Sequence, residues 1–176
     1  MTDLIIVDGY NIIFKDPAYK NIKDASLELA RVKLIEDLAN YQAYTGNDVK
    51  VVFDAAAQDS PGERKANVLG VEVIFTKKGQ SADSCIERLA FRADSDRTVI
   101  VATSDYSLQR VVFGKGIYRR TPSELLSEVG EAKDEWKVHA KDAKPSFLED
   151  RLDDEVREKL KRLMLTGGEE SHDAGK

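Results

Sequence analysis

The sequence has very little cysteine and no long apolar run. Its only cysteine among 176 residues is Cys85, which excludes an intrachain disulfide and favours a reducing compartment. No apolar stretch approaches the roughly 18–20 residues that cross a bilayer, and the first residues lack the basic segment of a signal peptide. We therefore expect a cytoplasmic protein that does not contact a membrane.

The sequence also lacks an excess of basic residues. It has 27 Lys and Arg against 32 Asp and Glu, a formal net charge of −5. Domains that bind nucleic acid mainly through charge are usually basic, so broad electrostatic binding is disfavoured. A local basic surface or a bound metal can still offset the net charge. Any contact with RNA should therefore be local or assisted by a larger partner.

What is present is an alternation of short apolar runs with amphipathic segments. Continuous β-branched runs are typical of strands buried on both faces, and apolar spacings of three and four are typical of helices. Segment 55–67 contains Ser60-Pro61-Gly62 and predicts a loop. The expected strands are 4–7, 49–53, 71–75, 98–102 and, weakly, 117–118; the expected helices are 24–44, 81–93, 104–112, 121–129 and 152–163.

This alternation predicts an α/β fold with right-handed crossovers and a doubly wound, mostly parallel sheet. The expected strand order is 3-2-1-4-5, with helices on both faces. We expect one domain over residues 1–130, a C-terminal helical extension over 131–165 and a disordered tail over 166–176. Ligands of such sheets bind beyond the carboxyl ends of the strands, where the order reverses.

Aspartates follow several of the predicted strands. Asp8 and Asp54 end the first two strands, Asp105 follows the fourth, and Asp83 lies in the first turn of the helix after the third. Carboxylates that converge repel one another unless a cation or protons intervene. Hard oxygen ligands suit Mg²⁺ or Mn²⁺, which can support phosphodiester hydrolysis. Asp54, Asp83 and Asp105 each have a simpler explanation as a helix cap or turn residue. That explanation is weakest for Asp8, because an ionisable side chain directly after a buried strand and before Gly9 requires a partner.

Three polar residues are expected to support these acids. Asn11 can hold Asp8 or contact a phosphate, and Thr103 and Ser104 can orient Asp105 or a water molecule. Their alternative role is ordinary turn formation and helix capping.

At this point the sequence resembles the NYN-domain ribonucleases of the PIN-like class, in particular the YacP-like bacterial branch. The resemblance implies a PIN-like fold, Mg²⁺-dependent endoribonuclease activity and an acidic site of Asp8, Asp54, Asp83 and Asp105. In that site Asp8, Asp83 and Asp105 are the expected metal ligands. The resemblance also implies messenger RNA cleavage on the ribosome. The motifs are Ile6-Val7-Asp8-Gly9-Tyr10-Asn11, Val51-Val52-Phe53-Asp54-Ala55, Ser81-Ala82-Asp83 and Val101-Ala102-Thr103-Ser104-Asp105-Tyr106.

Basic and aromatic residues near the predicted site are candidates for RNA binding. Tyrosines at positions 10, 19 and 106 can stack on bases, whereas any single lysine is also compatible with an ordinary solvated surface. The candidate phosphate contacts are Lys77, Lys78, Arg110, Lys115, Arg119 and Arg120.

Two other functions remain open at this stage. A non-catalytic RNA- or ribosome-binding module would keep the fold and use only its basic loops. An aspartyl-phosphate phosphotransferase would use Asp8 as a nucleophile and is expected to carry a second acid two residues later. That position is Tyr10, which disfavours the phosphotransferase.

Overall fold

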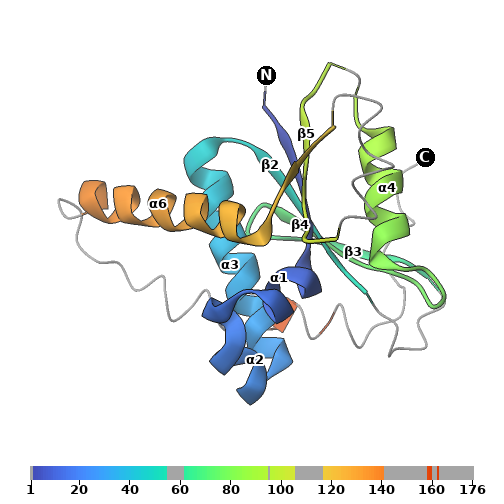
Figure 1. Ribbon diagram of the computed structural model, residues 1–176, viewed down its shortest axis with the longest axis horizontal. Coiled ribbons are helices and arrows are strands. Elements are labelled where there is room, and N and C mark those ends of the chain that lie inside the picture. Colours follow the sequence, from blue (N-terminus) through green and yellow to red (C-terminus); the bar gives the residue numbers. More distant parts are fainter. Residues whose placement is uncertain are drawn as a thin grey trace, which may run out of the picture.

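The computed structural model describes residues 2–54, 62–94, 96–105, 117–140, 158–159 and 162. These residues form one six-stranded sheet in the order β3-β4-β2-β1-β5-β6 (Figure 1). β3 pairs with β4 in antiparallel fashion, and the other neighbouring strands run parallel. The strands are β1 (Leu4–Asp8), β2 (Asp48–Phe53), β3 (Arg64–Val68), β4 (Val71–Phe75), β5 (Val99–Ala102) and β6 (Ile117–Arg120).

The predicted order of the five parallel strands is confirmed as β4-β2-β1-β5-β6. The prediction of a loop over 55–67 is wrong where β3 begins at Arg64. β3 and β4 are joined by a tight turn in which Leu69 has a φ of 53° and Gly70 a φ of 92°. Two positive φ values are typical of a type I′ hairpin. Leucine is unusual there, so the residue pattern gives little sign of the hairpin.

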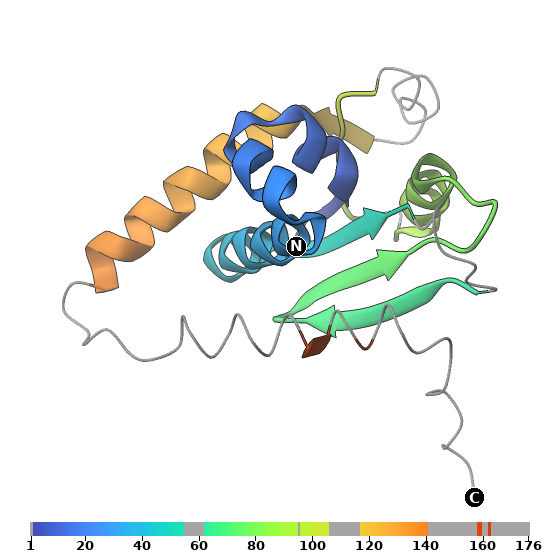
Figure 2. The ribbon, with the colours of Figure 1, turned by 90° about the horizontal axis from the view of Figure 1, so that it is seen from below.

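Helices cover both faces of the sheet (Figures 1 and 2). α1, α2, α3 and α6 pack on one face and α4 on the other. Helix α1 and the separate α2 were not predicted, because each has fewer than eight residues. The helices are α1 (Gly9–Lys15), η1 (Pro17–Tyr19), α2 (Lys20–Ala25), α3 (Leu27–Thr45), α4 (Ala82–Arg92) and α6 (Pro122–Ala140).

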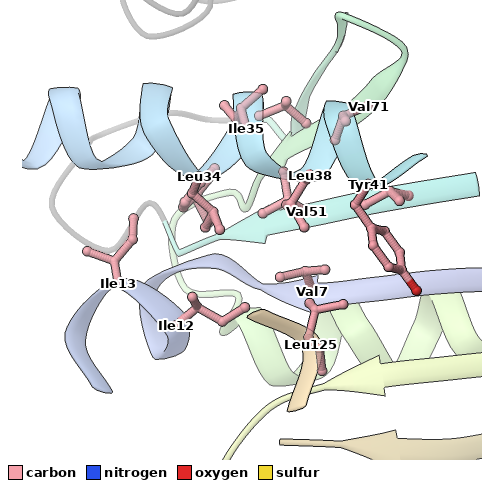
Figure 3. Packing of buried hydrophobic residues seen from close by; sticks show 14 of the residues in the cluster. Val7, Ile12, Ile13, Leu34, Ile35, Leu38, Tyr41, Val51, Val71 and Leu125 are labelled. Carbon is pink, nitrogen blue, oxygen red and sulfur yellow. The ribbon is translucent and has the colours of Figure 1, made fainter. Parts of the chain in front are cut away.

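The larger part of the core lies between α3 and the sheet (Figure 3). Leu34, Ile35 and Leu38 have no exposed surface, and their spacing of three and four residues places them on one side of α3. They pack over alternate residues of the strands, among them Val7 and Val51. The intervening strand residues face α4, where Cys85 is fully buried as a small core residue.

Helix α6 begins with the predicted capping box. The Thr121 hydroxyl accepts from the backbone N–H of Glu124 at 3.2 Å, and the Glu124 carboxylate accepts from that of Thr121 at 2.7 Å. The helix continues through position 130 to Ala140, so one helix crosses the proposed domain boundary, which stays a prediction. The predicted tail over 166–176 lies outside the described residues, as does most of the predicted last helix. No described helix is long and apolar enough to cross a membrane.

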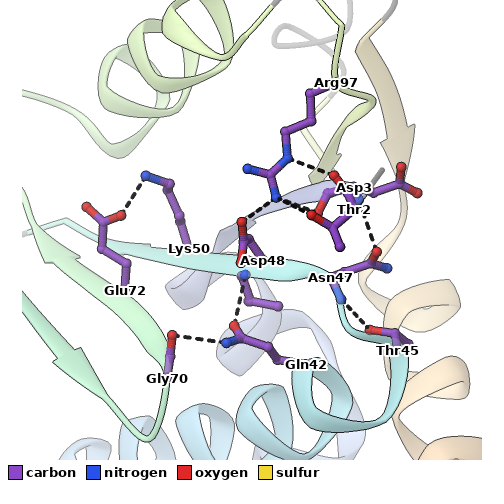
Figure 4. Close-up of polar contacts among 11 residues, drawn as sticks. Thr2, Asp3, Gln42, Thr45, Asn47, Asp48, Lys50, Gly70, Glu72 and Arg97 are labelled. Carbon is purple, nitrogen blue, oxygen red and sulfur yellow. Dashed lines mark hydrogen bonds and ion pairs between the residues drawn. The ribbon is translucent and has the colours of Figure 1, made fainter.

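The edge where the parallel strands begin is held by polar contacts (Figure 4). Arg97 donates to the carbonyl oxygens of Thr2 at 2.8 Å and Asp3 at 3.2 Å, and it forms an ion pair with Asp48. Gln42 accepts from the backbone N–H of Val49 at 3.0 Å. We call this side the amino edge and the opposite side, where the parallel strands end, the carboxyl edge.

Candidate active site

Asp8 is the residue around which the carboxyl edge is built. It ends β1 and caps α1, and its carboxylate accepts from the backbone N–H of Asn11 at 3.1 Å. The side chain is only 8% exposed. Gly9 is required next to it, because a Cβ at this position would lie 2.3 Å from the ring of Phe53, the last residue of β2. The sequence therefore turns sharply at Asp8 and leaves its carboxylate fixed at the edge.

Polar contacts tie the end of β5 to this turn. Thr103 is 1% exposed and lies close enough for its hydroxyl to lower the pKa of Asp8. The Asn11 side chain accepts from the backbone N–H of Ser104 at 2.9 Å. The Thr103 hydroxyl also accepts from the backbone N–H of Asp105 at 3.1 Å. It is thus the backbone of Asn11, and not its side-chain amide, that contacts Asp8, whereas the amide connects the turn to Ser104. The supporting roles of Asn11, Thr103 and Ser104 stay a prediction.

The four predicted aspartates are close enough to influence one another. The pKa of Asp8 is raised from 3.8 to about 6, mainly by burial and to a smaller extent by the charges of Asp83 and Asp105, while hydrogen bonds from Asn11 and Thr103 oppose the rise. Burial also raises the pKa of Asp83, with contributions from Asp105, Glu87 and Asp54. The structure therefore brings the acids of β1, β2, α4 and the segment after β5 into one electrostatic cluster.

Glu87 is a member of this cluster that the sequence reasoning did not select as a site residue. It lies four residues after Asp83 in α4, and residues four apart share one side of a helix. The spacing of four residues from Asp83 was therefore the feature of the sequence that could have identified Glu87. We call Asp8, Asp54, Asp83, Glu87 and Asp105 the acid cluster.

The chemistry of the acid cluster fits a hard divalent cation. Its oxygen ligands are of the type that Mg²⁺ and Mn²⁺ prefer, and a cation would relieve the repulsion that raises the pKa of Asp83. Within the described part of the chain, no three acidic, histidine or cysteine side chains gather closely enough to hold a metal by themselves. The arrangement therefore suits the usual binding of Mg²⁺ through one or two carboxylates, water and a substrate phosphate.

The predicted phosphate contacts have different environments. Lys77 and Lys78 are exposed in the turn between β4 and α4, at the carboxyl edge. Arg119 donates to the backbone carbonyl of Thr103 at 3.2 Å. Arg120 is engaged inside the fold, where it forms an ion pair with Glu128. Two further candidates, Arg110 and Lys115, lie outside the described residues.

The tyrosines proposed to stack on bases also differ in their environments. Tyr19 is 1% exposed and its hydroxyl donates to Asp37 at 2.9 Å, so the prediction that it stacks on bases is wrong. Tyr10 is partly buried, and its hydroxyl accepts from Arg31 at 2.8 Å. Tyr106 lies outside the described residues.

Comparisons with known proteins agree with this architecture. The profile of the YacP-like NYN domain matches residues 5–165, which includes the whole of the proposed C-terminal extension over 131–165. The chain is 48% identical over 128 residues to the protein YacP of Bacillus subtilis (strain 168), covering 72% of this chain and 75% of that protein.

Solved structures of Rae1 (YacP) from Bacillus subtilis have the same fold. One matches with a TM-score of 0.69 and 37% identity, covering 92% of this chain and 94% of that one. A mutant of the same protein matches with a TM-score of 0.67 and 40% identity, covering 85% of this chain and 90% of that one. The chain belongs to the YacP-like NYN domain family, and its membership indicates an RNA-related function of the nuclease type.

Proposed function

We propose that this protein is a metal-dependent endoribonuclease that hydrolyses phosphodiester bonds in RNA. The observation that carries the proposal is the acid cluster, in which burial, assisted by the charges of Asp83 and Asp105, raises the pKa of Asp8 to about 6. Such an arrangement destabilises the protein without a ligand, so a structural role alone explains it poorly. Membership of an NYN domain family supports chemistry on RNA.

Each acid has a proposed role. Asp8, Asp83 and Asp105 are the proposed ligands of Mg²⁺ or Mn²⁺, of which one or two would bind the cation directly beside water and the substrate phosphate, and Asp54 would assist just after β2. When bound, the cation would supply positive charge to the scissile phosphate and lower the pKa of the attacking water. Asn11 and Thr103 hold the Asp8 carboxylate in place through the contacts described above.

In the reaction, a water oxygen forms a bond to phosphorus while the bond to the leaving ribose oxygen breaks. The water must lose a proton, and the leaving oxygen must gain one. The water proton would pass to a carboxylate of the acid cluster that does not hold the cation, since a cation bound to a carboxylate lowers its pKa. By analogy with the PIN-like class, the expected product carries a 5′-phosphate.

The decisive experiment is RNA cleavage in Mg²⁺ by the wild type and by Asp8→Asn. A matched control is Asp48→Asn, because Asp48 lies at the amino edge and pairs with Arg97. We expect Asp8→Asn to lose activity by at least about 10²-fold, on the order of other electrostatic contributions to catalysis. The control should stay active, and EDTA should inhibit both the control and the wild type. Equal cleavage by wild type and Asp8→Asn would contradict the proposal, as would no cleavage by the wild type even with ribosomes and native message.

We further propose that the RNA is messenger RNA presented on the ribosome, which the family resemblance suggests. The net charge of −5 supports delivery by a partner, since it disfavours capture of RNA from solution. Co-sedimentation of the protein with ribosomes tests this step separately from cleavage. Absence from the ribosomal fraction at low salt would contradict it.

One observation favours a second candidate, a non-catalytic RNA- or ribosome-binding module. Within the described residues, the acids do not converge on a single point, while Lys77 and Lys78 are exposed beside them. This alternative predicts that Asp8→Asn behaves like the wild type in cells, and that Lys77→Glu with Lys78→Glu abolishes ribosome association. Charge reversal at Arg120 is a poorer test, because it would break the ion pair with Glu128.

A further inference from the structure

Helix α1 exposes a phenylalanine close to the acid cluster. Phe14 is 56% exposed, although its helix otherwise buries Ile12 and Ile13 against the core. A single exposed apolar side chain is common on protein surfaces and has no meaning by itself. Phe14 differs because of how it is anchored, what charge lies beside it and how near it is to Asp8.

Phe14 is the outer end of a row of aromatic rings that starts in the core. The rings of Phe75 and Phe53 are stacked with centroids 5.4 Å apart, and the Tyr10 ring meets Phe53 edge-on at 5.2 Å. Tyr10 in turn contacts Phe14 at 5.9 Å. A buried guanidinium fixes the row, since Arg31 is 7% exposed and donates to the Tyr10 hydroxyl. The ring of Phe14 is therefore held in place before any ligand arrives, which reduces the entropic cost of stacking.

Positive charge accompanies the exposed ring. The Lys23 ammonium lies 5.5 Å from the centroid of Phe14 and also forms a long, exposed ion pair with Asp24 at 3.5 Å. Lys15 and Lys20 are exposed on the same segment of chain. Aromatic rings flanked by cations are the combination that binds single-stranded nucleic acid, because the ring stacks on a base while the cation attracts the phosphate. An apolar protein partner would gain nothing from the lysines.

Phe14 is also within reach of a strand that passes Asp8. It lies six residues after Asp8 along α1, which corresponds to about 9 Å at a rise of about 1.5 Å per residue. Stacked nucleotides are about 3.4 Å apart along one strand. A base bound at Phe14 would thus lie within about three stacked nucleotides of a phosphate bound at Asp8.

We propose that Phe14 is a stacking site for a nucleobase of single-stranded RNA, next to the acid cluster and assisted by Lys23. The inference rests on the proposed function, because it takes RNA as the ligand. Every base has a flat face that can stack, so the site would hold the strand in position without selecting a sequence. Sequence reasoning chose Tyr19 for this role, which the structure buries, and passed over Phe14.

The test uses single-stranded RNA with 2-aminopurine at successive positions and the full chain carrying Asp8→Asn, so that the RNA stays intact. In this background we compare Phe14→Ala, Phe14→Trp and Tyr44→Ala. Tyr44 is a matched control because it is 48% exposed and lies near the C-terminal end of α3, away from Asp8. Circular dichroism and thermal unfolding check that each variant folds.

We expect Phe14→Ala to weaken RNA binding by about tenfold, within the roughly 5- to 150-fold that loss of one stacked base implies. It should also abolish the quenching of 2-aminopurine at one position. Phe14→Trp should retain both properties, and Tyr44→Ala should change neither. Equal binding by Phe14→Ala and Tyr44→Ala would overturn the proposal. So would a fall in the molecular mass of the protein on Phe14→Ala without a change in RNA affinity, because the ring would then contact a second copy.

Cleavage assays with chains that keep Asp8 distinguish a failure of this proposal from a failure of the proposed nuclease function. If the wild type does not cleave RNA but Phe14→Ala still weakens binding, the stacking site stands and the nuclease proposal fails. If cleavage depends on Asp8 but Phe14→Ala matches Tyr44→Ala in both binding and KM, the nuclease stands and the stacking site fails.

Discussion

Replacing Asp8 with asparagine should stabilise the metal-free protein, because the carboxylate is held in an unfavourable place. Burial and the neighbouring acids raise its pKa from 3.8 to about 6. The folded protein therefore binds this proton more tightly than the unfolded chain does. The resulting contribution to stability is fully present when the pH is below the pKa of this group in the unfolded chain. It is lost as the pH rises through about 6, the pKa in the folded protein.

The size of the effect follows from the shift. A rise from 3.8 to about 6 corresponds to about 3 kcal/mol, at about 1.4 kcal/mol per pKa unit. Above pH 7 the charged carboxylate thus costs up to about 3 kcal/mol relative to a neutral group. Asparagine removes the charge and keeps an oxygen that can accept from the backbone of Asn11 and cap α1. We expect a gain of about 1–3 kcal/mol at pH 8, shrinking to below about 1 kcal/mol near pH 4.

Urea unfolding followed by circular dichroism, in EDTA at pH 8 and pH 4, measures this difference. Asp48→Asn is the control, because it breaks an exposed ion pair with Arg97 and should cost at most about 1 kcal/mol. Adding Mg²⁺ should then stabilise the wild type and leave Asp8→Asn unchanged, since a ligand of the folded state shifts unfolding by mass action. If Asp8→Asn is less stable than the wild type at pH 8, or if the difference does not depend on pH, the reasoning about the acid cluster is refuted.

Three further substitutions test how the site and the helices beside it are supported. Gly9→Ala should destabilise by about 1–3 kcal/mol, because its Cβ would meet the ring of Phe53. Gly130→Ala in α6, where nothing lies within 4 Å of a new Cβ, should instead stabilise by about 0.5–1 kcal/mol; equal effects of the two in urea unfolding would exclude the steric explanation. Tyr19→Phe should cost about 1–3 kcal/mol in thermal unfolding, because the buried Asp37 loses its hydroxyl donor. An unchanged midpoint would show that this hydrogen bond contributes nothing net.

The parts of the fold that the sequence predicted are those with a strong local pattern. Strands buried on both faces appear as continuous β-branched runs, so β1, β2, β4 and β5 were found. The order expected for a doubly wound sheet of these strands is confirmed. That order alone placed Asp8, Asp54 and Asp105 at one edge. The structure adds that they and Asp83 are close enough to shift the pKa values of Asp8 and Asp83.

What the sequence did not show depends on contacts between distant segments. The start of β3 lies in a segment whose composition is typical of a loop, and its strand conformation depends on antiparallel pairing with β4. The burial of Tyr19 is due to Asp37, which lies 18 residues later in α3. Phe14 and Tyr10 are adjacent on one turn of α1, but only the structure shows that Tyr10 rests on Phe53 and leaves Phe14 exposed. The periodicity of apolar residues in a sequence does not show which distant residues a side chain will contact.

The two edges of the sheet show how charge is divided in this molecule. At the amino edge, acids are neutralised by nearby cations, since Asp48 pairs with Arg97 and Glu72 with Lys50. At the carboxyl edge, Asp83 instead lies among Asp105, Glu87 and Asp54, whose charges raise its pKa. A chain that can pair its acids at one edge and concentrates them at the other loses stability there, and such losses are usual at functional sites. The asymmetry is therefore better explained by a cationic ligand at the carboxyl edge than by folding.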